Sequence, residues 1–154
     1  MTTIDPRDQK VLDDISRYGW HVVKVFEDDA GPGFAFTIGL FESYGHPEVI
    51  AFGLPLDRLH AILNLVGVDA KAGLRRNAGD VSADFLAGYS CTFIEFPASA
   101  FAQYLGYALW FYSGRSFPVL QLVWPDKAGC FPWDPHVVPE VRDLQPTPGE
   151  PPNT

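Results

Sequence analysis

The chain has 154 residues, which is the size of one domain with a single hydrophobic core. Its apolar fraction of 47% and aromatic fraction of 14% are those of a globular protein. The net charge of −8 argues against general nucleic-acid binding, because phosphate contacts need clustered basic residues and only Arg75 and Arg76 are adjacent. No stretch approaches the ~20 consecutive apolar residues of a membrane-spanning helix, so we expect no membrane partner.

The cysteines indicate the cellular compartment of the protein, and the C-terminal composition indicates where its domain ends. Cys91 and Cys130 lie far apart and no apolar signal segment opens the chain, so we expect two buried thiols without a disulfide and a cytoplasmic protein. Residues 139–154 are rich in proline and have almost no large apolar residue after Leu144. We therefore predict one domain over residues 1–138 and a flexible proline-rich tail over 139–154.

Apolar spacing predicts the elements in chain order. Three segments have helical spacing and fitting end residues: 6–18, 56–66 and 99–113. Five short apolar or β-branched runs bounded by turn residues predict strands: 20–26, 34–40, 48–54, 89–96 and 118–124. Residues 69–79 have the composition of a loop with a short helical turn.

The order of these elements predicts the fold class. Strands 20–26 and 34–40 are joined by a turn rich in Asp and Gly, so they form an antiparallel hairpin. We expect a single α+β domain with a largely antiparallel sheet of about five strands and three helices. Neither of the glycine-rich phosphate-binding motifs occurs, so nucleotide binding has no support.

The segment Phe117–Asp134 combines the last strand with a loop of carboxylates, aromatic residues and turn residues. Asp126 follows Trp124 and Pro125 at the predicted strand end, and two interpretations of it are equally supported. A carboxylate beside an indole would have a raised pKa and serve as an acid or base. An aspartate after proline also commonly accepts hydrogen bonds from the next backbone amides, which is a structural role.

A second candidate is the loop containing Tyr44, His46 and Glu48. Residues two apart in an extended segment point to the same side, so His46 and Glu48 could share a ligand or a proton. We favour the structural alternative, in which the two residues form a capping and solvent-facing pair. Gln121 lies in an otherwise apolar strand, so it either faces a polar cavity or pairs with another buried polar group.

Metal and nucleophile chemistry find little support. His-x-Glu at 46–48 is half of the zinc deaminase signature, but the Pro-Cys-x-x-Cys half is missing. Cys91 and Cys130 lack activating neighbours, and no Gly-x-Ser-x-Gly motif occurs. We expect no metal and no cofactor; flavin binding in a split-barrel sheet would rest on fold analogy alone.

Four motifs resemble one protein family. They are Thr-Ile-Gly-Leu (37–40), Gly-His-Pro-Glu (45–48), Leu-Gln-Leu-Val-Trp-Pro-Asp (120–126) and Phe-Pro-Trp (131–133). In this order they resemble the bacterial domain-of-unknown-function family numbered 4262, over most of residues 10–134. The resemblance implies no activity. It places the following residues on motif positions: Thr37, Gly39, His46, Pro47, Glu48, Gln121, Pro125, Asp126 and Trp133.

Two functional hypotheses follow. In the favoured one, the protein is a binding module whose aromatic and polar pocket takes a small ligand or a protein segment. The pocket residues would be Tyr44, His46, Glu48, Gln121, Trp124, Asp126 and Trp133. In the alternative, the protein is an enzyme that uses His46, Glu48 and Asp126 for acid–base chemistry on a small polar substrate. The alternative requires His46 and Asp126 to converge in one cleft.

Overall fold

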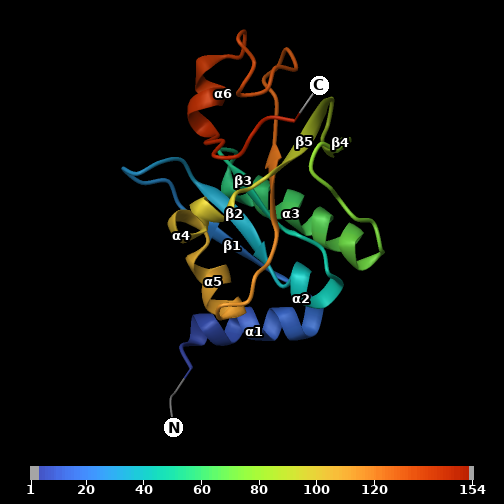
Figure 1. Cartoon of the computed structure of the whole chain (residues 1–154), viewed down its shortest axis with the longest axis vertical. Coiled ribbons are helices and arrows are strands. Elements are labelled where there is room, and N and C mark those ends of the chain that lie inside the picture. The colour runs from blue at the N-terminus through green and yellow to red at the C-terminus, as the bar shows by residue number, and fades with distance from the viewer. Residues whose placement is uncertain (1–3, 153–154) are drawn as a thin grey trace.

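The computed structural model describes residues 4–152. Its strands are β1 (His21–Val25), β2 (Phe34–Ile38), β3 (Glu48–Phe52), β4 (Val81–Leu86), β5 (Tyr89–Glu95) and β6 (Val119–Val123). Its helices are α1 (Pro6–Tyr18), α2 (Leu40–Tyr44), α3 (Leu56–Lys71), α4 (Phe101–Tyr104), α5 (Gly106–Tyr112) and α6 (Pro139–Leu144), with a 3₁₀ turn at Ala98–Ala100. Figure 1 shows α1, α2 and α5 at one end of the sheet and α6 at the other.

The six strands form one sheet in the order β1-β2-β3-β6-β5-β4. Every neighbouring pair is antiparallel except β3 and β6, which run parallel. The predictions of a single α+β domain, a largely antiparallel sheet and an antiparallel hairpin of β1 and β2 are therefore confirmed. Within residues 4–152 the sheet is open, with β1 and β4 at its edges, and it does not form the barrel that the flavin analogy assumed.

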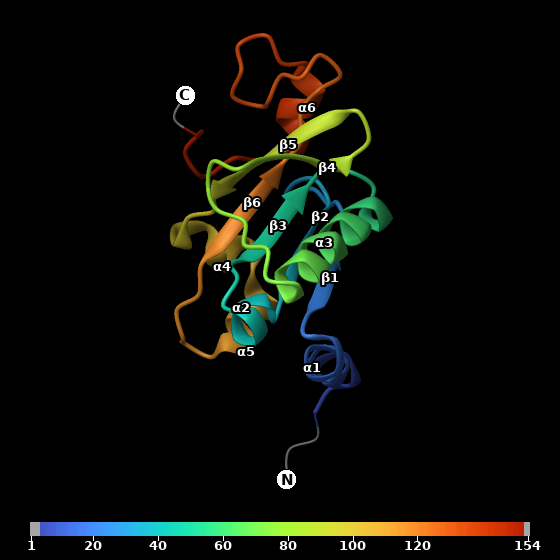
Figure 2. The ribbon, with the colours of Figure 1, turned by 90° about the vertical axis from the view of Figure 1, so that its right-hand side faces the viewer.

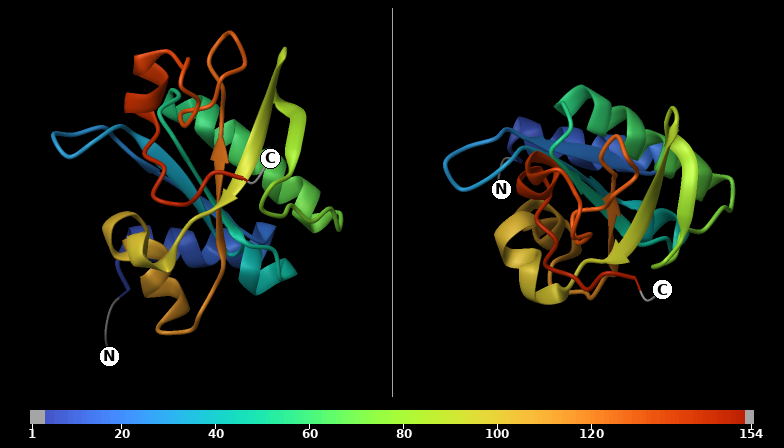
Figure 3. Two further views of the ribbon diagram at one scale, coloured as in Figure 1. Left: turned by 45° about the horizontal axis from the view of Figure 1, so that its top comes forward. Right: turned by 90° about the horizontal axis from the view of Figure 1, so that it is seen from above.

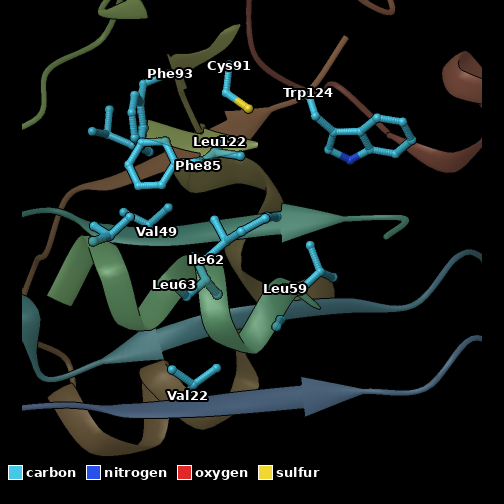
Figure 4. Packing of buried hydrophobic residues seen from close by; sticks show 14 of the residues in the cluster. Val22, Val49, Leu59, Ile62, Leu63, Phe85, Cys91, Phe93, Leu122 and Trp124 are labelled. Atoms are coloured by element: carbon cyan, nitrogen blue, oxygen red, sulfur yellow. The ribbon is translucent and has the colours of Figure 1, made fainter. Parts of the chain in front are cut away.

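Side chains alternate between two cores, one on each face of the sheet. On one face α3 packs against the strands through Leu59, Ile62, Leu63 and Val66. Figure 4 shows Leu59, Ile62 and Leu63 of α3 gathered with side chains of β1, β3, β5 and β6. On the other face, α1, α4 and α5 cover an aromatic-rich core that includes Phe36, Phe52, Phe96, Tyr112 and Phe117. Figures 2 and 3 show α3 and the pair α4 and α5 on opposite sides of the sheet.

Several predicted boundaries were wrong. β4 was missed because it lacks an alternating apolar pattern; only Ser82 and Phe85 are buried there, and its pairing with β5 has an irregular register. The predicted helix from Ser99 is broken at Leu105, whose backbone is not helical, immediately before Gly106. The short helix α2 lies where the sequence predicts the end of a strand and a loop without helix.

The sequence predicts that this helix ends at residue 66, before Gly67, but α3 continues through Gly67 to Lys71. A Cβ atom at Gly67 would lie 2.3 Å from Cε2 of Trp20, so only glycine lets this indole lie against the helix. Trp20 Nε1 also donates to Asn64 Oδ1 at 3.0 Å, one helical turn earlier. Gly67 is therefore a packing position that fixes the start of β1 against α3.

From Pro139, where the sequence predicts a flexible tail, the chain forms α6 and returns across the sheet. The buried side chain of Gln145 bonds to both backbone groups of Trp124: its Oε1 accepts from the N–H at 3.1 Å and its Nε2 donates to the carbonyl at 2.8 Å. Gln121 Nε2 donates to the carbonyl of Pro146 at 2.7 Å. The prediction of a flexible tail rested on the scarcity of large apolar residues. It did not include these contacts, because polar side chains form them.

We predict that Gly67→Ala lowers the free energy of unfolding by about 2 kcal/mol, because the added methyl group overpacks the contact with Trp20. Gly106→Ala is the matched control, since nothing lies within 4 Å of a Cβ there and alanine favours the helix. Urea unfolding of both variants measures the difference. Equal stability of the two variants would contradict the packing role of Gly67.

Candidate functional site

Glu48 is fully buried at the start of β3, and its carboxylate is an acceptor for groups from three elements. The Tyr112 hydroxyl of α5 donates to its Oε2. Its other donors belong to the end of β2 and to the start of α2: Thr37 Oγ1 (2.8 Å), Gly39 N (2.9 Å), Leu40 N (3.1 Å) and Phe41 N (3.3 Å). Burial raises the pKa of Glu48, and the hydrogen bonds oppose that shift. Glu48 thus holds structural elements together.

His46 is also buried, and both of its ring nitrogens are occupied. Nδ1 lies 2.7 Å from the carbonyl oxygen of Pro47, and the Arg76 N–H donates to Nε2 at 3.0 Å. A carbonyl only accepts, so the proton of the neutral ring is on Nδ1. Burial lowers the pKa of His46, and the charges of Arg75 and Arg76 add to that effect. His46 therefore joins the start of β3 to the loop after α3.

The structure does not bring His46 and Asp126 together. β3 and β6 are parallel, with Glu48 opposite Val119, so His46 precedes the beginning of this strand pair while Asp126 follows its end. The Tyr44 hydroxyl donates to the Tyr18 carbonyl at 3.2 Å, and its ring packs against Trp20. The acid–base alternative needed one cleft for His46, Glu48 and Asp126, and these positions do not provide it.

Asp126 caps the loop that follows β6. Its Oδ1 accepts from the N–H groups of Ala128 and Cys130, both at 2.9 Å, and its Oδ2 accepts from Val138 at 3.0 Å. These backbone donors, Cys130 and Val138 foremost, lower the pKa of Asp126. The raised pKa expected for an acid–base role is thus wrong, and the geometry is that of the turn-capping interpretation.

The remaining predicted residues lie in separate places. Gln121 is buried beneath the segment that contains Pro146, and its Oε1 has no hydrogen-bond partner. Trp133 is half-buried and stacks on Phe131, with ring centroids 5.3 Å apart. Of the seven predicted pocket residues, the structure places only Trp124 and Asp126 beside a shared hollow.

That hollow, which we call the apolar groove, has a volume of about 600 Å³. It lies between α3, the β4–β5 turn, the corner at 124–127 and α6. Its apolar side chains include Ile62, Leu65, Phe85, Leu86, Trp124, Val141 and Leu144. Trp124 Nε1 donates to the Phe52 carbonyl at 2.7 Å, which fixes the indole with its polar edge satisfied. Arg58, Lys127 and Glu140 are the exposed charged residues of its lining.

Sequence reasoning missed the contributions of α3 and α6 to this groove. Leu65 and Leu144 are exposed, although each belongs to a helix that also buries apolar residues. The available signal was the width of the apolar surface on α3, where Leu65 and Val68 lie outside the buried stripe. When a helix has more apolar residues than those that pack against the core, the remaining ones form a second apolar surface that is exposed to solvent.

Residues 14–138 match the model of a family described as Domain of unknown function (DUF4262). The chain belongs to this family. The DUF4262 match covers all six strands and ends at Val138, so the helix α6, which lines one side of the apolar groove, lies outside it. No curated protein and no solved structure matches the chain.

Two further findings concern the described part of the DUF4262 chain. Among residues 4–152, no three His, Cys, Asp or Glu side chains are grouped so that they could hold a metal ion. None of the helices in the same range has the length and apolar character needed to cross a bilayer. Cys91 and Cys130 are both free, and burial raises the pKa of the Cys91 thiol to about 11, so that thiol is protonated at neutral pH.

We predict that His46→Gln reduces the pH dependence of stability between about pH 5 and 7. The pKa of His46 is below 6.5 in the folded protein, so the unfolded chain binds more protons and stability falls as the pH drops through this range. Glutamine can accept from Arg76 but does not titrate. A smaller slope remains, because the pKa of His60 is lowered as well. Urea midpoints at several pH values measure the change, and exposed His136→Gln is the control; an unchanged slope in His46→Gln would contradict this role.

We predict that Asp126→Ala lowers the Tm by several degrees, because three backbone N–H groups lose their acceptor. Asp126→Asn should lose less, since its carbonyl still accepts from Ala128 and Cys130. The folded pKa of Asp126 lies below 3.8, so this contribution is present above that pH and disappears as the pH falls below it. Thermal unfolding at pH 7 and pH 3 tests both statements, with exposed Asp29→Ala as the control. An unchanged Tm in Asp126→Ala would exclude the capping role.

Proposed function

We propose that the protein is a binding module that takes a small, largely apolar ligand in the apolar groove. The observation that carries this proposal is the groove itself, which is open to solvent yet lined mainly by apolar side chains of three separate segments and α6. Its volume of about 600 Å³ is within the range of small-molecule sites.

Exposed apolar residues in the groove support a ligand. Leu65 is 46% exposed and Leu144 is 37% exposed, and both line the same hollow. Apolar surface removed from water stabilises a complex by about 25 cal/mol per Å². A ligand that covers both leucines removes this exposed apolar surface from water at one place.

The polar groups of the groove define the rest of the ligand. The Asp126 carboxylate is buried and accepts from three backbone N–H groups, so most of its acceptor capacity is used within the protein. Arg58 and Lys127 are the exposed cations of the lining and Glu140 is the exposed anion. An apolar body with one acidic group at the rim fits this balance best.

The test uses N-phenyl-1-naphthylamine as a probe, since this neutral fluorophore reports on the apolar contacts of the groove without adding an anionic group. Leu65→Glu should weaken its binding by at least about tenfold, because an unpaired carboxylate would be buried against the ligand. Leu74→Glu is the matched control, since Leu74 is 48% exposed and lies outside the groove lining. Fluorescence titration measures both affinities.

Equal binding by the Leu65→Glu and Leu74→Glu variants would overturn the proposal. Native mass spectrometry of the gently purified protein then identifies the class of ligand. A co-purifying mass that is present with Leu74→Glu and absent with Leu65→Glu would be the natural occupant, whether it is a small molecule or a peptide.

A further inference from the structure

A second hollow of about 600 Å³ lies along the free edge of β1, between α1 and α3. α3 contributes His60, Asn64 and Val68 to this hollow, whereas its residues Arg58 and Leu65 line the apolar groove. The two hollows therefore lie on different flanks of one helix and share no lining residue. We call the second one the β1-edge hollow.

The charges of the β1-edge hollow contrast with those of the whole chain. Its ionisable lining includes the basic residues Lys10, His21, Lys24 and His60 and a single carboxylate, Asp14. The chain as a whole has a net charge of −8. A local excess of basic groups in an acidic protein attracts a negative ligand to that place.

The single carboxylate is already paired. Asp14 Oδ2 lies 2.7 Å from His21 Nδ1 and 3.1 Å from Lys10 Nζ. The side chains of Asp14 and His21 are 19% and 18% exposed, so the pair is partly shielded from solvent. This contact uses Nδ1 of His21; among residues 4–152 no group bonds to Nε2, which is the ring nitrogen that can meet a ligand.

Lys24 has a much weaker partner. Its Nζ lies 3.9 Å from Asp57 Oδ1, and the Asp57 side chain is 99% exposed, so water screens this attraction strongly. Lys24 and His60 are thus the basic groups of the hollow without a close, shielded counter-charge among residues 4–152. They are the groups that an anionic ligand would contact.

The apolar part of the lining is rigid. Trp20 is fixed between Gly67 and the hydrogen bond from its Nε1 to Asn64 Oδ1. Val68, which is 56% exposed, extends the same surface along α3. An indole held in this way provides a preorganised apolar surface beside the basic groups.

We propose that the β1-edge hollow is a second binding site, for a small organic molecule in which a carboxylate or phosphate adjoins a flat apolar part. Lys24, His60 and His21 bind the oxyanion, and Trp20 and Val68 contact the apolar part. Asp14 orients His21. This assignment does not depend on the apolar groove, since no residue is common to both.

Protonation supports the same assignment. Burial lowers the pKa of His60, the charges of Lys24 and His21 lower it further, and Asp57 opposes them. The other charged groups of the lining are Lys10 and Asp14 on α1. A bound anion reverses the repulsion among the basic groups, so it favours the protonated form of His60 and binds more tightly at lower pH.

The experiment titrates benzoate, phenyl phosphate and neutral benzyl alcohol into the full chain at pH 6 and pH 8. The ring C–H signals of the histidines are followed by NMR and are assigned by their loss in His21→Gln and His60→Gln. We expect one or both anions to shift the His21 and His60 signals and to bind more tightly at pH 6. The ratio of the affinities for benzoate and phenyl phosphate shows whether the site prefers a carboxylate or a phosphate.

Variants test the contacts directly. Lys24→Gln should weaken binding of the anion by about fivefold, because one charge at contact distance from the oxyanion is lost. Lys71→Gln, an exposed lysine outside the hollow, should leave it unchanged. Equal affinity of both variants, binding of benzyl alcohol as tight as that of the anions, or shifts that exclude His21 and His60 would each overturn the proposal.

Discussion

The buried carboxylate of Glu48 is the constraint on which much of the structure depends. Burying a charge is costly unless hydrogen bonds compensate it, and here donors from β2, α2 and α5 all meet the same two oxygens. From these donors the chain continues through α2 to His46. The Nε2 atom of His46 accepts a hydrogen bond from the N–H of Arg76. Arg76 in turn lies over the rings of Phe85 and Phe93, so this series of contacts positions the β4–β5 hairpin and one side of the apolar groove.

The sequence predicted the fold better than the roles of its polar residues, for a physical reason. Apolar periodicity reports which face of an element is buried, so five of the six strands were predicted, and β4, with only Ser82 and Phe85 buried, was not. A polar residue in an apolar run signals that a partner exists, without saying whether the partner is a ligand or the protein itself. For Glu48 the partners include backbone N–H groups and a tyrosine 64 positions away, which no local pattern specifies.

The C-terminal segment shows the same limit of composition. Few large apolar residues follow Leu144, yet Gln145 bonds to both backbone groups of Trp124 as a neighbouring strand would. The side chain of Gln121 then holds the next residue, Pro146. Two glutamines thus attach the segment through side-chain amides, and α6 is placed where Val141 and Leu144 complete the groove. α6 lies outside the span that matches the family.

α3 connects the two proposed sites. Its buried stripe is fixed to the sheet by Leu59, Ile62, Leu63 and Val66, while Gly67 receives the indole of Trp20. A helix packed this tightly does not shift by small continuous amounts, because a close-packed interface resists deformation. Coupling between the two proposed sites would therefore require a second, discrete arrangement of α3 for which each ligand has a different affinity. The two proposed sites, one apolar and one basic, lie on different flanks of this one helix and share no lining residue.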